Sequence, residues 1–484
     1  MNFKPEFRIL SDDQIYDIHQ AALDLLWKTG VSVKSKEACN LLRKAGARVD
    51  GETMLCRIPG YIIEESLKRA PSAFTIYARN PAKNVRVSTK ALHYEPMIGR
   101  MNVYDCNTKR THLMTLKDVG ELVKLADAMP NYQLLHSGAI MPRIADVPIR
   151  ATHVYGYLQS VRNSSKVIKA TSRERIMAED CLRMVAAVAG SEDELRNKPY
   201  TFTTANPVTP LLHDRDQLEG ALLYAKWGQP IDVTSEPQAG ATAPVTLAGL
   251  LTQQTADVIS GITIIQLLNP GNPVWFGTCG SIMDLRLGRI AMGAVEMGMI
   301  NVATAQLAHF YNIPCRGTAL ATDSKLLDMQ AGYEKATILT MAALGGVNKI
   351  FYAGTMEGAM TVSKESLVID NEIIGGLYRV LDGIDVNEET LAVKVIDRVG
   401  PGGHFLSQRH TMKFLKKGAH FLPSISDRRT RDKWGEAGSK DTVQRAHEKV
   451  EEILAAHQVD PLDAGVEAEL ERIVREVDER EAGR

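Results

Sequence analysis

The stretch 273-PVWFGTCGS-281 decides the fold, together with two stretches like it, 313-IPCRGTAL-320 and 349-KIFYAGTMEG-358. Each begins as a short apolar and β-branched run, which is typical of a buried strand, and ends in a glycine-rich loop. Long helical patterns separate the three runs. A repeated order of strand, helix and strand predicts a parallel sheet, because each crossover between parallel strands needs a helix.

The same alternation extends upstream through the middle of the chain. Seven strands are predicted, at Gln133–Ile140, Lys166–Ala170, Tyr200–Ala205, Ile231–Ser235, Val274–Thr278, Pro314–Thr318 and Lys349–Ala353. An eighth is expected near Gly403–Leu406. Seven or eight strand–helix units predict an α/β chain built on a TIM (β/α)₈ barrel. The alternative, a doubly wound open sheet, usually has a glycine-rich nucleotide-binding turn after its first strand, and MPRIADVP at 141–148 is not such a turn.

The distribution of charge divides the chain. Only 15 of the 131 residues from Pro230 to Met360 are charged, against 27 of the 59 from Ser426 to Arg484. The first segment has the composition of a region buried on several sides, and the second that of a solvated helical surface. We therefore predict an N-terminal α+β extension at 1–130, a barrel domain at 131–425 and charged C-terminal helices at 426–484.

Net charge and cysteine usage exclude several classes of protein. Lys and Arg number 57 and Asp and Glu 58, so a net charge of −1 provides no basic field for nucleic acid or an anionic membrane. The six cysteines include no CxxC pair, and the N-terminus has no signal-peptide pattern, which favours a cytoplasmic protein. No apolar run reaches ~18 residues, so no membrane span is expected.

Polar residues at strand ends are candidate site residues, because a TIM barrel carries its site at the C-terminal ends of its strands. The residues selected by this rule are Thr204, Asn206, Glu236, Thr318, Glu357 and, in the loop GPGGH, His404. Four aromatic residues also lie near predicted strand ends or just before the loop EPMIGR, namely Trp275, Phe276, Tyr352 and Tyr94. An aromatic wall beside Glu236 would suit a cation without N–H groups, and the alternative is that these rings pack in the core.

Motifs for a protein nucleophile or a metal are missing from the sequence. It contains no GxSxG, HExxH or P-loop, so no metal site is expected. Cys279 and Cys315 lie on neighbouring predicted strands, and with a histidine they could bind zinc. A zinc-dependent barrel methyltransferase or hydrolase therefore remains an alternative.

Longer segments of the chain resemble one protein family. They are SIMDLRLGRIAMGAVEMGMINVATAQLAHFYNIPCRGTALATDSKLLDMQAGYEKA at 281–336, AGTMEGAMTVSKESLVIDNEIIGGLYRVLDGI at 353–384 and VGPGGHFLSQRHTMKF at 399–414. These segments resemble the trimethylamine methyltransferase family, and the similarity extends over most of the chain. The resemblance implies a TIM barrel and methyl transfer from a methylated amine to the cobalt of a separate corrinoid protein. Because the chain contains only the twenty standard residues, it is similar to the pyrrolysine-free branch, which is associated with quaternary amines such as glycine betaine.

The resemblance implies catalysis without a protein nucleophile. Co(I) in a corrinoid is already a strong nucleophile, and a quaternary nitrogen leaves as a neutral tertiary amine. The enzyme then has to hold the cation, aim one methyl group at cobalt and exclude water. Because positive charge disperses as the methyl group leaves, strong anionic clamping would stabilise the ground state more than the transition state.

This interpretation assigns roles to the candidate residues. The expected catalytic residues are Glu236, Tyr352 and His404, and the expected substrate-binding residues are Tyr94, Thr204, Asn206, Trp275, Phe276, Arg316, Thr318 and Glu357. Arg316, Lys169 and His404 are candidates to bind the carboxylate of a betaine. The expected partners are a corrinoid protein that carries cobalamin, a small quaternary amine and further copies of the chain in a homo-oligomer. The remaining alternative is a non-catalytic protein that binds quaternary ammonium compounds.

Overall fold

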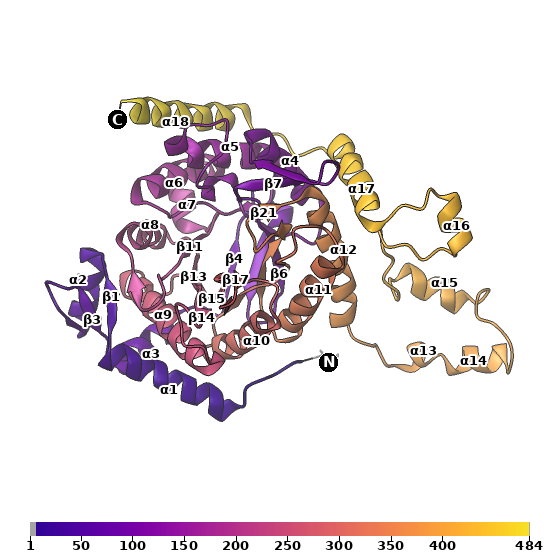
Figure 1. The fold of residues 1–484 in the computed structure, drawn as a ribbon, viewed down its shortest axis with the longest axis horizontal. Helices are drawn as coiled ribbons and strands as arrows, with labels where there is room; N and C mark the ends of the chain where they lie inside the picture. Colours follow the sequence, from indigo (N-terminus) through magenta and orange to yellow (C-terminus); the bar gives the residue numbers. More distant parts are fainter. Residues whose placement is uncertain (1–5, 484) are drawn as a thin grey trace.

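Eight parallel strands form a closed barrel at the centre of the structure, a computed structural model that describes residues 6–483 (Figure 1). In order round the barrel the strands are β6 (His93–Pro96), β9 (Leu134–Leu135), β10 (Val167–Ile168), β11 (Thr203–Ala205), β13 (Ile231–Ser235), β15 (Val274–Thr278), β18 (Cys315–Thr318) and β19 (Lys349–Ala353). The outer ring consists of α4 (Leu116–Ala128), α5 (Thr152–Asn163), α6 (Arg175–Ala189), α8 (Arg215–Lys226), α9 (Leu247–Leu268), α10 (Val295–Phe310), α11 (Met329–Leu344) and α12 (Lys364–Leu381). The predicted TIM barrel is confirmed.

The barrel closes through two seams. Six strands pair in the order β11–β13–β15–β18–β19–β6, and β9 pairs with β10. At one seam the backbone N–H of Gln133 donates to the oxygen of Tyr94 at 3.2 Å, and at the other Ala170 N–H donates to Phe202 O at 3.1 Å. The paired strands within these two sheets are all parallel, as the alternation of strands and helices predicted.

The eighth strand is not where the sequence placed it. Gly403–Leu406 forms no strand, and these four residues are exposed. The barrel instead takes β6, whose sequence HYEP is short, ends in proline and has no apolar alternation, so it was not recognisable as a barrel strand. β6 pairs with β19 from His93 to Pro96, so the barrel sheet draws on residues before the proposed boundary at 130.

A hairpin closes the N-terminal end of the barrel. Its strands are β4 (Ala73–Ile76) and β5 (Val85–Ser88), which pair antiparallel. Phe74 of this hairpin contacts Trp275 edge-on, with ring centres 4.9 Å apart, and Phe202 lies 5.6 Å from the same tryptophan. These rings belong to a buried apolar cluster at the base of the barrel.

The remaining N-terminal elements cover one side of the barrel. They are α1 (Asp12–Lys28), β1 (Val31–Val33), α2 (Lys36–Ala45), β2 (Arg48–Val49), β3 (Leu55–Arg57) and α3 (Gly60–Arg69), and β1 also pairs with β12 (Leu212–His213). α1, α2 and α3 all pack on α9. This second layer explains why α9 is apolar on nearly all sides, since both its inner and its outer face are buried.

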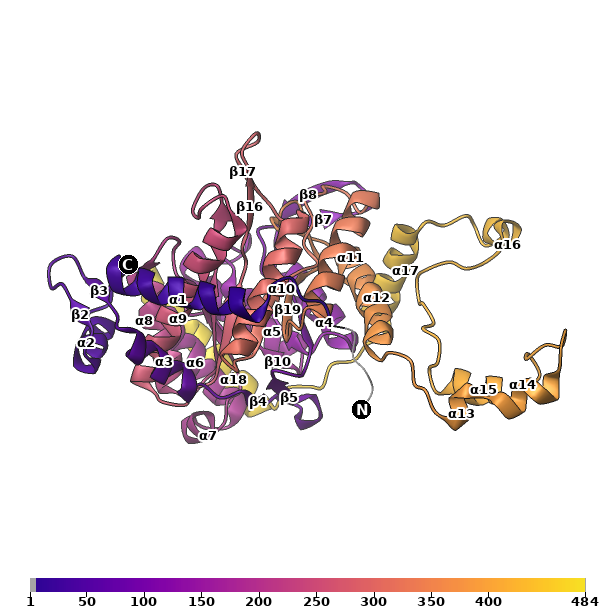
Figure 2. The same cartoon turned by 90° about the horizontal axis from the view of Figure 1, so that it is seen from below.

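Two small sheets lie over the C-terminal end of the barrel (Figure 2). The first, here called the cap sheet, consists of β7 (Asn102–Asp105), β8 (Arg110–Leu113), β20 (Thr355–Met356) and β21 (Thr361–Val362). The second consists of β14 (Gln238–Ala239), β16 (Ser281–Asp284) and β17 (Arg289–Ala291). Both arise from loops that follow barrel strands, so they surround the end where a TIM barrel carries its site.

The chain beyond α12 leaves the barrel and returns to it. An arm with α13 (Glu388–Leu391), α14 (Val393–Val399) and α15 (Arg409–Lys416) extends far from the barrel, followed by α16 (Arg431–Glu436) (Figure 2). The tail then packs back as α17 (Thr442–Ala456) against α12 and α4, and as α18 (Ala464–Ala482) against α5 and α6. Both helices lie in the charged segment after residue 426, and the side chain of Asp441 caps the N-terminus of α17.

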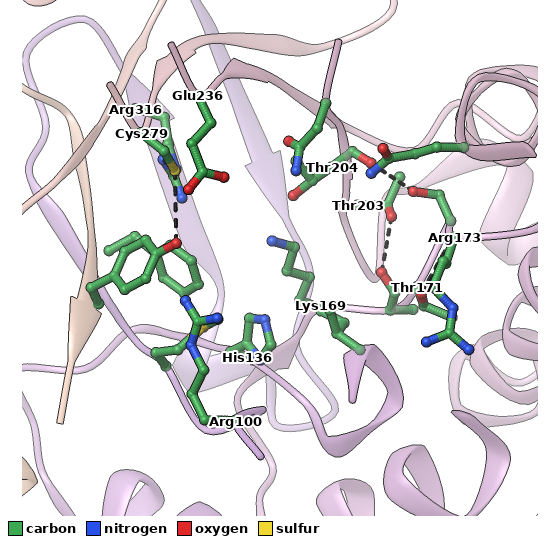
Figure 3. Close-up of a pocket in the computed structure, with 18 residues that line it drawn as sticks. Arg100, His136, Lys169, Thr171, Arg173, Thr203, Thr204, Glu236, Cys279 and Arg316 are labelled. Atoms are coloured by element: carbon green, nitrogen blue, oxygen red, sulfur yellow. Dashed lines mark hydrogen bonds between the residues drawn. The ribbon is translucent and has the colours of Figure 1, made fainter. Parts of the chain in front are cut away.

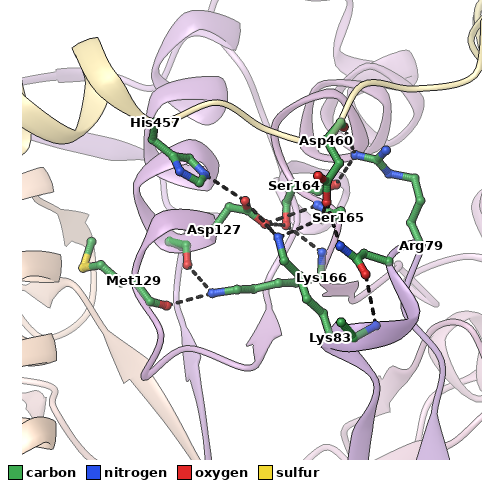
Figure 4. A network of polar contacts seen from close by, with 12 residues as sticks. Arg79, Lys83, Asp127, Met129, Ser164, Ser165, Lys166, His457 and Asp460 are labelled. Carbon is green, nitrogen blue, oxygen red and sulfur yellow. Dashed lines mark hydrogen bonds and ion pairs between the residues drawn. The ribbon is translucent and has the colours of Figure 1, made fainter.

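A polar network ties the link between α17 and α18 to the barrel (Figure 4). His457 Nε2 lies 2.9 Å from Asp127 Oδ2, and Asp460 Oδ2 accepts a hydrogen bond from Ser165 Oγ at 2.8 Å. Arg79 donates to the main-chain oxygen of Pro461 at 2.7 Å. The charged tail is therefore docked on the barrel. In residues 6–483, helices with the length and hydropathy of a membrane span are absent.

Candidate active site

A cavity of about 250 Å³ opens at the carboxyl ends of the barrel strands (Figure 3). Most of its wall comes from residues at the ends of β10, β11, β13, β15, β18 and β19, and part comes from the loop after β6. The polar side chains in the wall that matter below are Arg100, His136, Lys169, Arg173, Thr204, Asn206, Glu236, Cys279, Arg316 and Tyr352. Its position is the one at which TIM-barrel enzymes carry their active sites.

An irregularity in β19 brings Tyr352 to the cavity. Successive residues of a regular strand point to opposite faces, yet Phe351 and Tyr352 both line the cavity. The pairing with β6 shifts between Phe351 and Ala353, and Tyr352 has a φ of 90°. A strained conformation of this kind costs of order 1–3 kcal/mol and is found most often at functional sites. Thr355 Oγ1 donates to Tyr352 O at 2.8 Å and helps to hold this geometry.

Buried charged side chains fill the barrel interior beneath the cavity. Lys349 Nζ lies 2.8 Å from Asp232 Oδ2 and 3.2 Å from Glu95 Oε2. Arg316 Nε lies 3.5 Å from the same Asp232 oxygen. Burial alone would raise the pKa of Asp232, but Lys349 and Arg316 outweigh it and lower the pKa to about 2. Lys349, Arg316 and protonated Lys169 together face the two carboxylates of Asp232 and Glu95. This charged layer therefore has a net positive charge.

Lys169 projects into the centre of the cavity (Figure 3). Its Nζ lies 3.8 Å from Glu95 Oε1 and 5.2 Å from the ring centre of Phe351. Burial lowers the pKa of Lys169 to about 8, although Glu95 opposes the shift. Nearby His136 accepts a hydrogen bond at Nδ1 from Gly99 N–H at 3.2 Å. Burial, followed by Lys169, lowers the pKa of His136 well below its usual value, so its ring is neutral.

Glu236 supplies the carboxylate of the cavity wall. Burial raises its pKa, and the cations Arg100 and Arg316 partly offset that shift. On the same side, Cys279 Sγ accepts a hydrogen bond from Arg316 Nη1 at 2.7 Å, and Thr318 Oγ1 lies 3.3 Å from the same sulfur. Arg316 is thus held within the wall by the Nη1 bond to Cys279 and by its ion pair with Asp232, while its buried Nε makes no hydrogen bond within residues 6–483.

Five of the predicted site residues meet in this cavity: Thr204, Asn206, Glu236, Arg316 and Tyr352. The lysine proposed to bind a carboxylate, Lys169, is also there. Thr204 Oγ1 is buried and has no hydrogen-bond partner within residues 6–483. An unpartnered hydroxyl in a cavity wall is available to a ligand. The catalytic and binding roles of these residues stay predictions.

Three predicted aromatic residues lie away from the cavity. Trp275 belongs to the cluster at the base of the barrel, beneath the charged layer. Phe276, its neighbour in β15, points outward and packs on Tyr311 with ring centres 5.6 Å apart. Tyr94 is fully buried and packs edge-on against Tyr378 of α12. Nearness to a strand end was a poor guide here, because height in the barrel and strand alternation decide where a ring points.

Three predicted polar residues also lie outside the cavity wall. Thr318 is fully buried, and its Oγ1 donates to Thr278 O at 3.0 Å. Glu357 turns to its own hairpin, where Oε2 accepts a hydrogen bond from Thr361 Oγ1 at 2.8 Å. His404 is exposed on the arm, because the strand expected to carry it to the barrel mouth does not exist.

The sequence rule missed Arg100, His136 and Arg173. Arg100 ends the loop EPMIGR, and its guanidinium lies 5.0 Å from the ring centre of Tyr352. The signal in the sequence was an arginine at the end of the loop that follows Tyr94. It was missed because β6, the strand that leads into this loop, was not recognised. His136 and Arg173 follow β9 and β10, where no motif marked them.

The ligand set required by the zinc alternative is not formed. Cys279 Sγ is occupied by Arg316 and Thr318, and Cys315 is fully buried in β18, where burial raises its pKa. In the part of the chain that the structure describes, one group of three side chains could hold a metal, and it contains neither of these cysteines.

Comparisons with known proteins agree with this geometry. A family model described as trimethylamine methyltransferase (MTTB) matches residues 1–482. The chain is 35% identical over 471 residues to the glycine betaine methyltransferase of Desulfitobacterium hafniense strain Y51, covering 97% of each protein. It is 33% identical over 480 residues to the trimethylamine methyltransferase MttB of D. hafniense strain DSM 10664 / DCB-2, covering 97% of this chain and 94% of that protein.

A solved structure supports the fold. The monomethylamine methyltransferase MtmB of Methanosarcina barkeri superposes with a TM-score of 0.53 at 11% identity, covering 99% of this chain and 90% of that one. At such low identity the likeness concerns the fold alone. The family match and the full-length relatives concern the whole chain, and with them the chain belongs to the trimethylamine methyltransferase family.

Proposed function

We propose that the chain transfers a methyl group from a zwitterionic quaternary amine, glycine betaine or a related betaine, to the Co(I) of a corrinoid carried by a separate protein. The distribution of charge in the cavity carries this proposal. Glu236 lies on one side of the open space, and Arg100, Lys169 and Arg173 lie on the others (Figure 3). A small ligand with a cationic and an anionic end matches both sides.

The ammonium end is assigned to Glu236. A quaternary nitrogen has no N–H group, so it is held by charge and by contact with aromatic rings. Of the four expected aromatic residues Tyr352 alone lines the cavity, where Phe351 joins it. Arg100 already lies 5.0 Å from the ring centre of Tyr352, and Arg316 lies 4.8 Å from that of Phe351. Glu236 therefore provides most of the attraction for the cation.

The carboxylate end is assigned to Lys169. Its ion-pair partner Glu95 is 3.8 Å away, beyond hydrogen-bonding distance, so the ammonium hydrogens of Lys169 are available to a ligand in the cavity. Hydrogen bonds between charged groups contribute about 1.5–3 kcal/mol each. An amine without a carboxylate, such as choline or tetramethylammonium, forgoes this contribution and leaves the cationic side of the cavity unpaired.

The cavity is too small to hold a corrinoid, which agrees with a corrinoid that stays bound to its own protein. About 250 Å³ accommodates a betaine but not a corrin macrocycle, so the corrinoid would meet the methyl group at the cavity mouth. The corrinoid supplies the nucleophile. The chain holds both ends of the substrate, which fixes the direction of one methyl group and excludes water. No proton has to be delivered, because the amine leaves as neutral dimethylglycine nitrogen. The relative named as a glycine betaine methyltransferase supports this substrate class.

A substrate panel tests the proposal. The protein is mixed anaerobically with cob(I)alamin, and Co–CH₃ formation is followed by absorbance with glycine betaine, choline, tetramethylammonium or trimethylamine. We expect the fastest methylation with glycine betaine and dimethylglycine as the product. Binding of betaines without Co–CH₃ formation would contradict methyl transfer. Equal rates with glycine betaine and tetramethylammonium would contradict recognition of the carboxylate.

We further propose a cytoplasmic homo-oligomer in which the arm contacts a second copy of the chain. The arm exposes many apolar side chains while extending away from the barrel (Figure 2), and they include Ile384, Val386, Leu391, Val393, Ile396, Leu406, Met412 and Leu422. A patch of this kind on an extended segment is typical of a subunit contact. Ile384→Asp with Leu406→Asp should lower the molar mass measured by light scattering to that of a monomer. An unchanged mass would contradict the assignment.

A further inference from the structure

We propose that Cys106, Glu365 and His447 bind a zinc ion that fastens α17 to the cap sheet over the cavity. One ligand atom from each of these residues lies within 4.8 Å of the other two. Cys106 is in the turn between β7 and β8, Glu365 is in the first turn of α12, and His447 is in α17. Thiolate sulfur, imidazole nitrogen and carboxylate oxygen are the three ligand types that zinc takes from proteins.

The distances between these atoms suit a tetrahedral ion. Cys106 Sγ lies 3.5 Å from His447 Nδ1. Zinc bonds of about 2.3 Å to sulfur and 2.0–2.1 Å to nitrogen, at a tetrahedral angle, place those two atoms about 3.5 Å apart. His447 Nδ1 lies 2.9 Å from Glu365 Oε1, a hydrogen-bond distance that has to lengthen by a few tenths of an ångström.

Neighbouring groups already orient the ligands. The other oxygen of Glu365, Oε2, accepts a hydrogen bond from Ser363 Oγ at 2.8 Å, which leaves Oε1 directed at the histidine. The side-chain amide of Asn107 lies 3.5 Å from His447 Nε2. Turning this amide over presents its oxygen to the Nε2–H that His447 carries when Nδ1 binds a metal. Ligands supported in this way are typical of built metal sites.

An ion has access to the three ligands. Cys106 and His447 line a surface groove of about 630 Å³, to which Asp328, Asp441 and Gln444 also contribute. The side chain of Glu365 is buried, with 4% of its surface exposed, so this ligand forms the inner, protein side of the site. Water or a carboxylate of the groove completes the fourth position. The site thus combines a fixed inner side with an open outer side.

The position of the site suggests what the ion would do. β7 begins two residues after Arg100, which lines the cavity, and β7 also pairs with β21, which follows Tyr352. Zinc would join the turn of this hairpin to α12 and to the tail helix α17, which are far apart in the sequence. It would therefore hold the cap sheet over the cavity without touching the substrate. This inference does not depend on the substrate assignment.

Metal titration of tag-free, chelator-treated protein tests the site. We expect one Zn²⁺ per chain by calorimetry, and with Co²⁺ in its place a thiolate-to-cobalt absorbance band together with tetrahedral d–d bands. Bound Zn²⁺ should raise the melting temperature by several degrees, since ligands that bind only the folded state stabilise it. Cys106→Ser should abolish the thiolate band, and His447→Gln should weaken binding at least tenfold.

Matched variants keep the test specific. Cys39→Ser removes a buried cysteine far from the groove, and His404→Gln removes an exposed histidine of the arm, so both should keep the band and the stoichiometry. Cys106 lies in an exposed hairpin turn, so Cys106→Ser is expected to fold. The proposal is overturned if no equivalent of zinc binds, or if Cys106→Ser and His447→Gln bind it as tightly as the unaltered protein.

Discussion

Lys166 and Lys169 flank β10 three residues apart, and both are buried, yet their surroundings differ. Lys166 Nζ donates to the main-chain oxygens of Ala126 and Met129 at 2.8 and 2.7 Å, at the C-terminal end of α4 (Figure 4). Lys169 Nζ projects into the cavity, where its ion-pair partner Glu95 is 3.8 Å away (Figure 3). The first lysine caps a helix, and the second is left for a ligand.

The difference teaches that a lowered pKa does not by itself mark a functional lysine. Burial lowers the pKa of Lys166 to about 7 and that of Lys169 to about 8. A neutral amine still has two N–H donors, which are enough for the two carbonyl groups that Lys166 contacts. Attraction of a carboxylate by Lys169 needs the positive charge. Hydrogen-bond partners therefore separate the two roles where burial does not.

Lys169→Met should have the largest effect on activity. Losing one charged hydrogen-bond donor to a carboxylate corresponds to about 2–3 kcal/mol, or roughly a hundredfold loss in kcat/KM for glycine betaine. The free energy of unfolding should change far less, since Glu95 keeps Lys349 at 3.2 Å. Lys169→Arg should recover part of the loss. If choline, which has no carboxylate, loses as much kcat/KM as glycine betaine, Lys169 does not recognise that group.

Lys166→Met should affect stability instead of activity. It leaves two buried carbonyl oxygens without their donor, which should lower the free energy of unfolding by about 2–4 kcal/mol. Urea denaturation measures this change, and kcat/KM of the protein that remains folded should be unchanged. Lys34→Met, which removes an exposed lysine that donates to Thr53 O, is the control and should change stability by less than about 0.5 kcal/mol. A loss of activity without a loss of stability would reverse the assignment of the two lysines.

The fold could largely be predicted from the sequence, because apolar runs and helical periodicity report burial directly. Seven barrel strands follow from those runs. β6 does not, since HYEP is held in the sheet by its pairing with β19 and not by a pattern of its own. The strand expected at Gly403–Leu406 does not form, and β6, far upstream in the sequence, takes the eighth place in the barrel.

The site could be predicted only where a side chain directly follows a recognised strand. Glu236 and Asn206 meet that condition, and Thr204 and Arg316 lie within the last residues of such strands. Arg100 comes from a loop whose path depends on contacts with Tyr352 and His136. The strand-end rule pointed to Tyr352, but not to the bulge with which it reaches the cavity. Cys106, Glu365 and His447 share no spacing motif, since three distant segments bring them together.

In free energy, the effect of Glu236→Gln on catalysis should be smaller than that of Lys169→Met on catalysis or of Lys166→Met on folding. It should also differ in how it divides between KM and kcat. The carboxylate attracts the cation in the ground state, whereas positive charge disperses as the methyl group leaves. KM for glycine betaine should rise about tenfold while kcat changes by less than about threefold. Steady-state kinetics with Glu357→Gln as the control, whose side chain is outside the cavity, measures the split. A fall in kcat at constant KM would instead indicate a role for Glu236 in the chemical step.

The pH dependence should be the most gradual effect, and it distinguishes the two lysines in the unaltered protein. Lys169 loses its charge as the pH rises through about 8, so KM for glycine betaine should increase by up to tenfold per pH unit above 8, while that for choline stays level. Folding should respond in the opposite direction. Both lysines bind protons more weakly in the folded than in the unfolded chain, so their contribution to stability rises with pH from about 7 towards 10.5. Lys169→Arg, which keeps its charge, should flatten the KM profile. A profile that Lys169→Arg leaves unchanged would show that another group sets the pH dependence.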